Sequence, residues 1–352
     1  MSTILGVKSV LPGKAIFSGI QPTGVFHLGN FLGAIKSWVD LSRSAPENSP
    51  ILFMIADLHA ITVARSPEKL RKQRWEALAS IIASGIDPKR CTVYFQSDVP
   101  AHAQLHWILS SISSMGYLNR MVQWKSKANL DESASLTNSD LTNLNLALFS
   151  YPTLQAADVL IHQAGYVPVG EDQSQHLELT RHLAQAFNFR FGETFTIPAT
   201  VLSPHKKILS LRDSTKKMSK SDPDQTSCVY VTDTAEEIKT KLKRALTDSV
   251  QGEITWDPEQ RPAVANLLSI AAGLQDMEAP DFLAKHPMKN HKELKDTVAD
   301  CLIESLSPIR EEYNRLVSDQ AYLESLANHG RDIAHERTSG TLEKAYRAVG
   351  YL

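Results

Sequence analysis

The chain has 352 residues and a mass of 39.0 kDa, a length that fits two domains of roughly 150 residues each better than one or three. Hydrophobic residues make up 42% and charged residues 22% of the chain, which excludes collagen-like, coiled-coil and wholly disordered proteins. With 37 Lys and Arg against 39 Asp and Glu, the net charge is −2, so binding to nucleic acid requires a local basic patch.

The three cysteines stand far apart, at Cys91, Cys228 and Cys301, and form no CxxC pair. A sparse, odd set is typical of a reducing compartment and argues against a zinc site built from thiolates. No apolar run reaches the roughly 18 residues that a membrane-spanning helix needs, so we expect no membrane partner. The leader up to Gly13 carries Lys8 and no acidic residue, which is compatible with a trimmed organellar presequence, although it lacks arginine.

The first half of the chain alternates apolar runs with amphipathic stretches. Strands are predicted over residues 15–20 (AIFSGI), 51–55 (ILFMI) and 93–96 (VYFQ), and an uninterrupted run such as ILFMI is typical of a strand covered on both faces. Helices are predicted over residues 30–41 and 67–84, the second with proline in its first turn. This β-α-β-α order predicts an α/β fold whose parallel sheet has helices on both faces.

The second half changes character twice. Residues 128–145 are dominated by Asn, Asp, Ser and Thr and predict an exposed insertion, after which strand-like patterning returns at 167–170. Beyond about Pro223 the patterns are helical, and Thr234 and Glu237 form a capping box that opens a helix. We therefore expect an all-helical C-terminal third. The buried face of this first helix is predicted to hold Ile238, Leu242 and Leu246, and later helical periods cover residues 293–306 and 308–317.

Two separated segments carry the strongest chemical signal. Residues 22–30 (PTGVFHLGN) join the first strand to a helix N-terminus, which offers N–H groups and a positive dipole to phosphates. There, Gly29 allows a flat base close to the backbone, and His27 and Asn30 can donate to phosphate or ribose oxygens. Residues 217–221 (KMSKS) place two ammonium groups on a flexible loop that can close over a triphosphate. Taken singly, such a histidine is more often a capping or core residue and such lysines are more often solvated.

In this order and context, the two segments resemble the HIGH-type and KMSKS signatures of class I aminoacyl-tRNA synthetases. Further motifs narrow the resemblance to the tryptophanyl-tRNA synthetases of the bacterial and mitochondrial type, and it covers nearly the whole chain from about Ala15. The sequence departs from the family pattern in the polar insertion and in the leader. The motif QWKSK at residues 123–127 and the HLGN form of the first signature favour the mitochondrial branch of the family. The narrowing motifs lie at residues 17–24, 57–62, 99–104, 151–158 and 167–173.

The resemblance implies a Rossmann-like parallel-sheet catalytic domain over residues 14–225, including the KMSKS loop, followed by an all-helical anticodon-binding domain over 226–352. It implies a ligase that activates L-tryptophan with ATP and Mg²⁺, releases diphosphate and esterifies tRNA(Trp). It also implies a homodimer, no metal held by protein ligands, and a place in the mitochondrial matrix, with the bacterial cytoplasm as the alternative.

The resemblance further assigns roles to single residues. Asp158 accepts the indole N–H of tryptophan, and a carboxylate is the natural partner for a group that only donates. Standing alone, Asp158 is as commonly a helix-surface acid, but its apolar neighbours indicate a buried flank. The remaining tryptophan-binding residues are Phe17, Gly19, His59, Gln123, Tyr151, Val167, Val169 and Gln173. Those assigned to ATP are Gln21, His27, Leu28, Gly29, Asn30, Gly170, Glu171, Asp172, Ile208, Lys217, Met218, Ser219, Lys220 and Ser221. Those assigned to catalysis are His27, Asn30, Lys127, Lys217 and Lys220.

Three other functions fit the motifs less well. A pocket built on Asp158 argues against a tyrosyl enzyme of the same class, and a small-molecule nucleotidyltransferase needs neither the KMSKS loop nor a long helical domain. The intact signature residues argue against a non-catalytic RNA-binding module of synthetase descent. The pair His102 and His106 has the i,i+4 spacing of zinc ligands but no third ligand in view. Trp75 and Trp107 lie on predicted helices that can form a subunit contact. The basic set of Lys239, Lys241, Lys243 and Arg244 is either a solvated helix face or a contact to the tRNA backbone.

Overall fold

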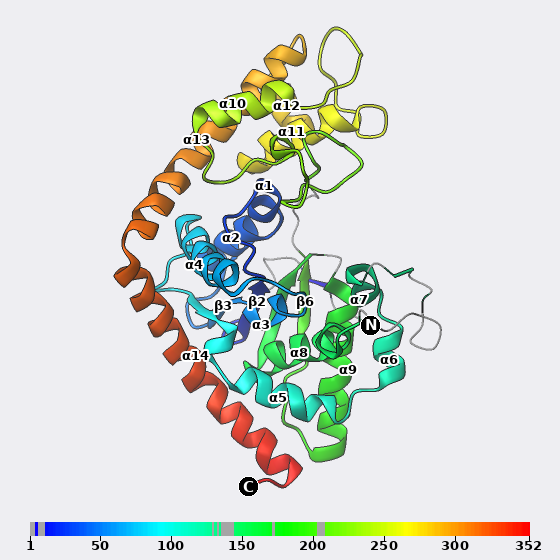
Figure 1. The fold of residues 1–352 in the computed structure, drawn as a ribbon, viewed down its shortest axis with the longest axis vertical. Coiled ribbons are helices and arrows are strands. Elements are labelled where there is room, and N and C mark those ends of the chain that lie inside the picture. The colour runs from blue at the N-terminus through cyan, green and yellow to red at the C-terminus, as the bar shows by residue number, and fades with distance from the viewer. Residues whose placement is uncertain are drawn as a thin grey trace.

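A computed structural model describes residues 4–5, 11–128, 130–131, 134, 144–170, 173–202 and 208–352. Its centre is a six-stranded, wholly parallel sheet with the strand order β1-β6-β5-β2-β3-β4 (Figure 1). This confirms the predicted α/β fold with a Rossmann-like sheet. The strands are β1 (Ile4–Leu5), β2 (Ala15–Ile20), β3 (Ile51–Ile55), β4 (Thr92–Phe95), β5 (Ala164–Val169) and β6 (Ala199–Leu202).

The strand order reverses beside β2. The chain first builds β2, β3 and β4 outward in one direction, then returns to place β5 and β6 on the other side of β2. In parallel sheets, ligands bind at the carboxyl ends of the strands next to such a reversal. The crevice of interest therefore lies where β2 ends at Ile20 and β5 ends at Val169.

Helices cover both faces of the sheet, and their ends follow local sequence signals. The helix predicted over 67–84 is confirmed as α4, with the Ser66 side chain accepting from the Lys69 amide. The helix predicted over 30–41 begins earlier, at Leu28, and passes through a π-helical turn, Phe31–Ile35, into α2. In this half the helices are α1 (Leu28–Asn30), α2 (Lys36–Ser44), α3 (Asp57–Ala60), α4 (Pro67–Ala83), α5 (Ala101–Ser110), α6 (Met115–Asn119), α7 (Val122–Lys127), α8 (Leu146–Ile161) and α9 (Ser174–Phe191).

The last third of the chain is helical, as predicted. Two details differ. Leu246 is 44% exposed, because α10 ends at Arg244 before reaching it, and the two predicted segments, 293–306 and 308–317, form one helix, α13. The predicted insertion at 128–145 falls largely outside the described residues, as do the leader residues 1–3 and 6–10. The helices are α10 (Ala235–Arg244), α11 (Pro262–Leu274), α12 (Ala279–Lys285), α13 (His291–Ser318) and α14 (Gln320–Val349).

Two hydrophobic clusters lie against opposite faces of the sheet. Alternation along β2 sends Ile16 into one cluster and Phe17 into the other. The cluster around Ile16 continues without a break into α10–α13, so the helical third shares its core with the sheet. Trp75 is partly buried against this core, where its ring packs edge-on against Phe95 at 5.2 Å, whereas Trp107 is 73% exposed.

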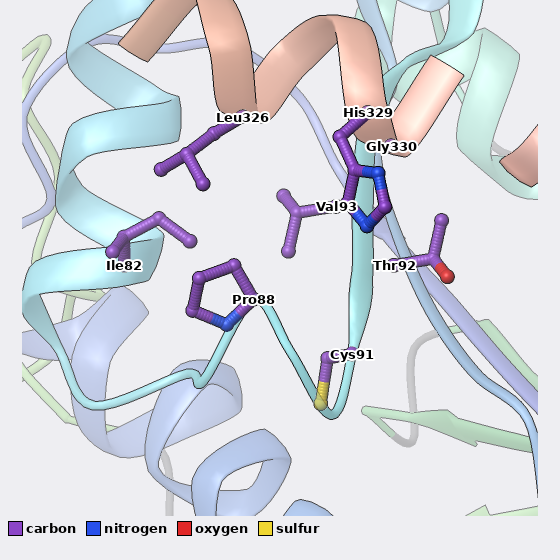
Figure 2. Close-up of a pocket in the computed structure, with 8 residues that line it drawn as sticks. All are labelled: Ile82, Pro88, Cys91, Thr92, Val93, Leu326, His329 and Gly330. Atoms are coloured by element: carbon purple, nitrogen blue, oxygen red, sulfur yellow. The ribbon is translucent and has the colours of Figure 1, made fainter. Parts of the chain in front are cut away.

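Helix α14 returns from the helical third and lies along β4, the edge strand of the sheet (Figure 1). Figure 2 shows this contact: Leu326 and Gly330 of α14 face Ile82 of α4 and Val93 of β4 around a small pocket. No helix among the described residues is long and apolar enough to cross a membrane.

Candidate active site

The loop after β2 carries the residues predicted to bind ATP. His27 caps α1: its Nδ1 accepts from the Asn30 amide, and the Asn30 side-chain oxygen accepts from the His27 amide, each at 3.3 Å. Because Nδ1 accepts, the ring proton lies on Nε2. Burial and the nearby Lys220 ammonium lower the pKa of His27 to about 4, so this ring is a neutral donor at pH 7.

Gly29 and Met218 bring the two signature segments into contact. A Cβ at Gly29 would lie 2.9 Å from the ring of His27 and 3.6 Å from Cβ of Met218. Only glycine at this position leaves room for the capping histidine. Residues 26–28 pair with residues 229–231, and the Leu28 amide donates to the Val229 carbonyl at 2.8 Å. Leu28 itself is a fully buried core residue, so it supports this site from behind.

The KMSKS residues lie on one arm of a short hairpin whose other arm is residues 208–210. Met218 donates to the Ile208 carbonyl at 3.0 Å, and Ser210 donates to the Lys216 carbonyl at 2.9 Å. Asn266 of α11 clamps the hairpin, accepting from the Leu209 amide at 2.9 Å and donating to its carbonyl at 3.1 Å. Beyond it, the Ser219 and Ser221 hydroxyls bond each other at 2.8 Å.

Lys220 reaches across to the loop after β2. Its ammonium donates to the Thr23 carbonyl at 2.9 Å, to the Thr23 hydroxyl at 3.2 Å and to the Val25 carbonyl. Burial lowers the pKa of Lys220 to about 8. The structure therefore brings this lysine beside His27, as the sequence predicts, with its three N–H groups bonded to protein oxygens. Lys217 pairs through its backbone with Leu209 in the same hairpin.

Asp158 of α8 is the centre of the other side of the crevice. Its carboxylate is 1% exposed, and Oδ1 accepts from Gln96 at 2.7 Å and from His102 Nδ1 at 2.8 Å. Oδ2 accepts from His59 Nε2 at 2.7 Å. Burial alone would raise the pKa of this carboxyl, but the hydrogen bonds from His102 and His59 outweigh it and hold the pKa below its usual range. Asp158 is thus buried as predicted and ionised at neutral pH.

The hydrogen bonds continue behind Asp158. His102 Nε2 lies 3.0 Å from the Tyr94 hydroxyl, which lies 2.6 Å from His162 Nε2. Phe17 stacks on His162 with ring centroids 5.3 Å apart. Tyr94, Gln96 and His162 were not predicted as site residues from the sequence. Only Gln96 carried a signal, as the polar end of a predicted buried strand. Of the pair with zinc-ligand spacing, His102 is bonded to Asp158 and Tyr94, and within the described residues no hydrogen bond joins His106 Nε2 to this network.

Tyr151, also on α8, carries a second polar group. Its hydroxyl donates to His176 Nε2 at 3.1 Å, and His176 Nδ1 donates to the Gln173 side-chain oxygen at 2.9 Å. The ammonium of Lys127 lies 4.2 Å from the centre of the Tyr151 ring. Burial and the charge of Arg65 lower the pKa of Lys127. The predicted Lys127, Tyr151 and Gln173 therefore come together, with His176 as an additional member.

The other predicted wall residues lie on the strands of the crevice. Gly19 lies at the end of β2, and Val167 and Val169 lie at the end of β5, with Val167 buried and Val169 half-buried. His59 joins this wall to Asp158, and its ring meets that of Tyr151 edge-on at 6.1 Å. Gln21 and Gly170 follow directly after the two strands, Gln123 lies on α7, and Glu171 and Asp172 lie outside the described residues.

A metal ion held by the protein needs several ligands in one place. No group of three or more His, Cys, Asp or Glu among the described residues could hold an ion. A protein cage for Mg²⁺ is therefore not formed by these residues, and Mg²⁺ commonly binds through substrate phosphates instead.

Comparison with known proteins gives one coherent result. The family described as tRNA synthetases class I (W and Y) matches residues 13–307. The chain is 44% identical to the mitochondrial tryptophan–tRNA ligase of Saccharomyces cerevisiae, over 99% of this chain and 93% of that protein. It is 42% identical to tryptophan–tRNA ligase of Clostridium acetobutylicum, over 96% of this chain and 97% of that protein. The crystal structure of tryptophanyl-tRNA synthetase from Mycoplasma pneumoniae superposes with a TM-score of 0.81 at 30% identity, covering 96% of this chain and 97% of that one.

Proposed function

The chain belongs to the class I tRNA synthetases of the tryptophan and tyrosine type and is a tryptophan–tRNA ligase, and we propose how its residues carry out the reaction. The carboxylate of tryptophan attacks the α-phosphorus of ATP, and the bond to diphosphate breaks. A hydroxyl at the 3′ end of tRNA(Trp) then attacks the activated carbonyl, and AMP leaves. Such a transfer is catalysed mainly by positioning and charge stabilisation.

The single observation that carries the tryptophan assignment is the state of Asp158. Its buried, ionised carboxylate has both acceptor positions of Oδ1 filled by Gln96 and His102. Oδ2 has one partner among the described residues, His59, so it retains one acceptor position. The indole N–H of tryptophan fills that position, and the walls are Phe17, Gly19, Val167 and Val169. Tyr151, Gln173 and Gln123 hold the amino-acid end.

On the nucleotide side, we assign ATP to the surface made by the two signature segments. His27 donates to phosphate through Nε2, and the glycine at position 29 leaves the backbone open to the nucleotide. Asn30 supplies a hydrogen-bond donor to the phosphates, and the ammonium groups of Lys217 and Lys220 supply positive charge. Lys127 contacts the phosphates from the side where tryptophan binds. Ribose and adenine lie against Gln21, Ile208 and residues 170–172. Mg²⁺ would accompany ATP and would supply further positive charge to its phosphates beside Lys217 and Lys220.

The partner tRNA is held in part by α10. Lys239, Lys243 and Arg244 are exposed on this helix, whereas Lys241 is engaged with Asp233 at 2.5 Å. Three exposed cations on one short helix suit a phosphate backbone. We propose a catalytic domain over 14–225 and an anticodon-binding domain over 226–352. In this division α10 belongs to the tRNA-binding domain.

We propose a homodimer formed through helices α5, α6, α8 and α9. These helices pack on one another, and each exposes one large apolar side chain. A second copy of the chain covers this group. The four side chains are Phe189 (95% exposed), Leu146 (76%), Trp107 (73%) and Met115 (58%).

We place the protein in the mitochondrial matrix, with the bacterial cytoplasm as the alternative. The support is the 44% identity to the mitochondrial enzyme of Saccharomyces cerevisiae, set against 42% to that of Clostridium acetobutylicum. Growth of yeast on a respiratory carbon source, after this gene replaces the mitochondrial relative, tests the matrix assignment; failure of an expressed, active enzyme to enter mitochondria contradicts it.

The proposed function is tested by ATP–diphosphate exchange with each of the twenty amino acids. Exchange should depend on tryptophan and should be far weaker with tyrosine. Asp158→Ala should lower kcat/KM for tryptophan roughly tenfold or more, the scale of a lost hydrogen bond to a charged group, with a smaller change in KM for ATP. Exchange driven by tyrosine, or an unchanged kcat/KM for tryptophan in the variant, would remove Asp158 from the pocket.

A further inference from the structure

A continuous chain of buried side chains runs from Asp158 to the C-terminal helix. It passes through His102, Tyr94 and His162, which are each at most 1% exposed. At its far end, Arg337 of α14 donates to the His162 carbonyl at 2.8 Å. Burial keeps water from replacing a lost partner, so each hydrogen bond fixes the next ring in place.

The donors along this chain all point toward Asp158. A carboxylate only accepts, so His102 Nδ1 donates to Oδ1 and carries a proton. Burial lowers the pKa of His162 well below its usual value, so its ring carries one proton. His162 Nδ1 has no partner within the described residues, whereas Nε2 lies 2.6 Å from Tyr94. The proton on Nε2 therefore donates to the Tyr94 oxygen, and the Tyr94 hydroxyl donates to His102 Nε2.

The direction of these hydrogen bonds determines which carboxylate oxygen of Asp158 can accept from a ligand. Gln96, in the turn directly after β4, and His102 of α5 both bond Oδ1 and so fix the rotation of the carboxylate. Only Oδ2 is left to meet a ligand, on the side of His59. A carboxylate that turned would present a filled oxygen to the pocket.

We propose that His102 and Tyr94 are positioning residues that make the pocket selective for a ring N–H, by holding Asp158 with Oδ2 toward the amino acid. This inference rests on the proposed function, in which Asp158 accepts the indole N–H. A purely structural network would stabilise the fold without changing which ring is chosen.

The test compares tryptophan with its isostere β-(3-benzothienyl)alanine, in which sulfur replaces the N–H. The readout is the ratio of kcat/KM for the two substrates, because a site that needs a donor rejects an analogue lacking it. Tyr94→Phe should lower this ratio about fivefold, the scale of one neutral hydrogen bond, while KM for ATP stays unchanged. The matched control is Tyr166→Phe, another buried tyrosine of the sheet, whose hydroxyl accepts from the Leu11 amide at 3.1 Å.

Two variants of His102 sharpen the test. His102→Leu removes the donor to Oδ1 and should lower the ratio roughly tenfold or more. His102→Asn places an amide N–H near the position of Nδ1 and should recover part of that loss.

A ratio that stays at the wild-type value in Tyr94→Phe and in both His102 variants overturns the inference, even if their melting temperatures fall. That outcome leaves the proposed function intact. If the wild-type enzyme itself does not distinguish tryptophan from the sulfur analogue, then Asp158 is not the acceptor, and both the inference and the assignment of the pocket fail.

Discussion

Burial has different consequences for two neighbouring side chains that we propose contact ATP. His27 stays neutral at pH 7, because its pKa is lowered to about 4, and it serves as a donor through Nε2. Lys220 is still mainly charged at pH 7, but its pKa is lowered only to about 8, close to the working range. Its charge is therefore sensitive to pH where that of an exposed lysine is not.

This sensitivity predicts a pH dependence for the use of ATP. The ammonium form of Lys220 is the one that attracts phosphate, and it is lost as pH rises through about 8. Since kcat/KM reports the free enzyme, kcat/KM for ATP should fall above pH 8 in the wild-type protein. Lys220→Arg keeps its charge to far higher pH, so its profile should stay flat through this range. The same fall in both proteins would assign the titration to another group, such as Lys127, whose pKa is also lowered.

At the scale of elements, the KMSKS hairpin lies between the two halves of the molecule. Asn266 of α11 hydrogen-bonds both the amide and the carbonyl of Leu209 in the hairpin. Leu211, just after the 208–210 arm, accepts from the Leu246 amide at 2.7 Å, which joins the hairpin to the segment after α10. Its tip reaches the loop after β2 through Lys220. In the proposed mechanism, ATP competes with the Thr23 and Val25 carbonyls for the Lys220 ammonium.

Removing that charge should affect the chemical step. Lys220→Ala should lower the rate of adenylate formation by roughly 10²-fold or more, because negative charge moves onto the leaving diphosphate in the transition state. KM for tryptophan should change little, since the residues around Asp158 lie elsewhere. The measurement is single-turnover adenylate formation with saturating ATP and tryptophan.

The matched control is Lys216→Ala, on the same hairpin, whose side chain is 74% exposed and paired with Asp213. It should keep the wild-type rate. A wild-type rate in Lys220→Ala as well would mean that the hairpin takes no part in activation.

Helix α10 gives a prediction for the tRNA step. Replacing Lys239, Lys243 and Arg244 with Ala should weaken tRNA binding and flatten its dependence on salt, because fewer counterions are released. Adenylate formation should be unchanged, since these side chains point to solvent and are not at the crevice. The control is Lys344→Ala, an exposed lysine near the end of α14. An unchanged salt slope in the triple variant would show that this face is only solvated.

The sequence predicts these elements unevenly, and the reasons are physical. Continuous apolar runs such as ILFMI predict β3 at its observed bounds, and Ser66 with Pro67 predict the start of α4, because both signals are local. The extent of α13 across Pro308 and the exposure of Leu246 depend on tertiary packing, which the local pattern does not contain.

The site shows the same limit. Motif positions such as His27, Asp158 and Lys220 could be named as candidates from the sequence, and the structure places His27 and Lys220 near each other after β2 and buries Asp158 in α8. Tyr94 and His162 lie in apolar stretches with nothing to distinguish them from core residues. Their connection to Asp158 appears only when β4, α5 and α8 are packed together.

At the scale of the whole molecule, α14 joins the end of the chain to the sheet it left at residue 202. The helix covers β4, which would otherwise be an open edge, and its Arg337 donates to the His162 carbonyl at the end of α8. The C-terminal helix therefore packs on the parallel sheet, although it follows the other C-terminal helices in sequence.

Gly330 allows this helix to lie so close to the strand. A Cβ at this position would lie 1.9 Å from the Val93 carbonyl oxygen, so α14 would have to move off β4 (Figure 2). Gly330→Ala should therefore destabilise the protein by about 1–3 kcal/mol, the range for overpacked sites. At Gly340, an exposed glycine of the same helix, a Cβ would have no atom of the described residues within 4 Å, so Gly340→Ala should stabilise by up to about 1 kcal/mol through helix propensity. Urea unfolding midpoints of the two variants should thus move in opposite directions from the wild-type value. Equal stabilisation by both would mean that α14 does not lie against the edge of the sheet.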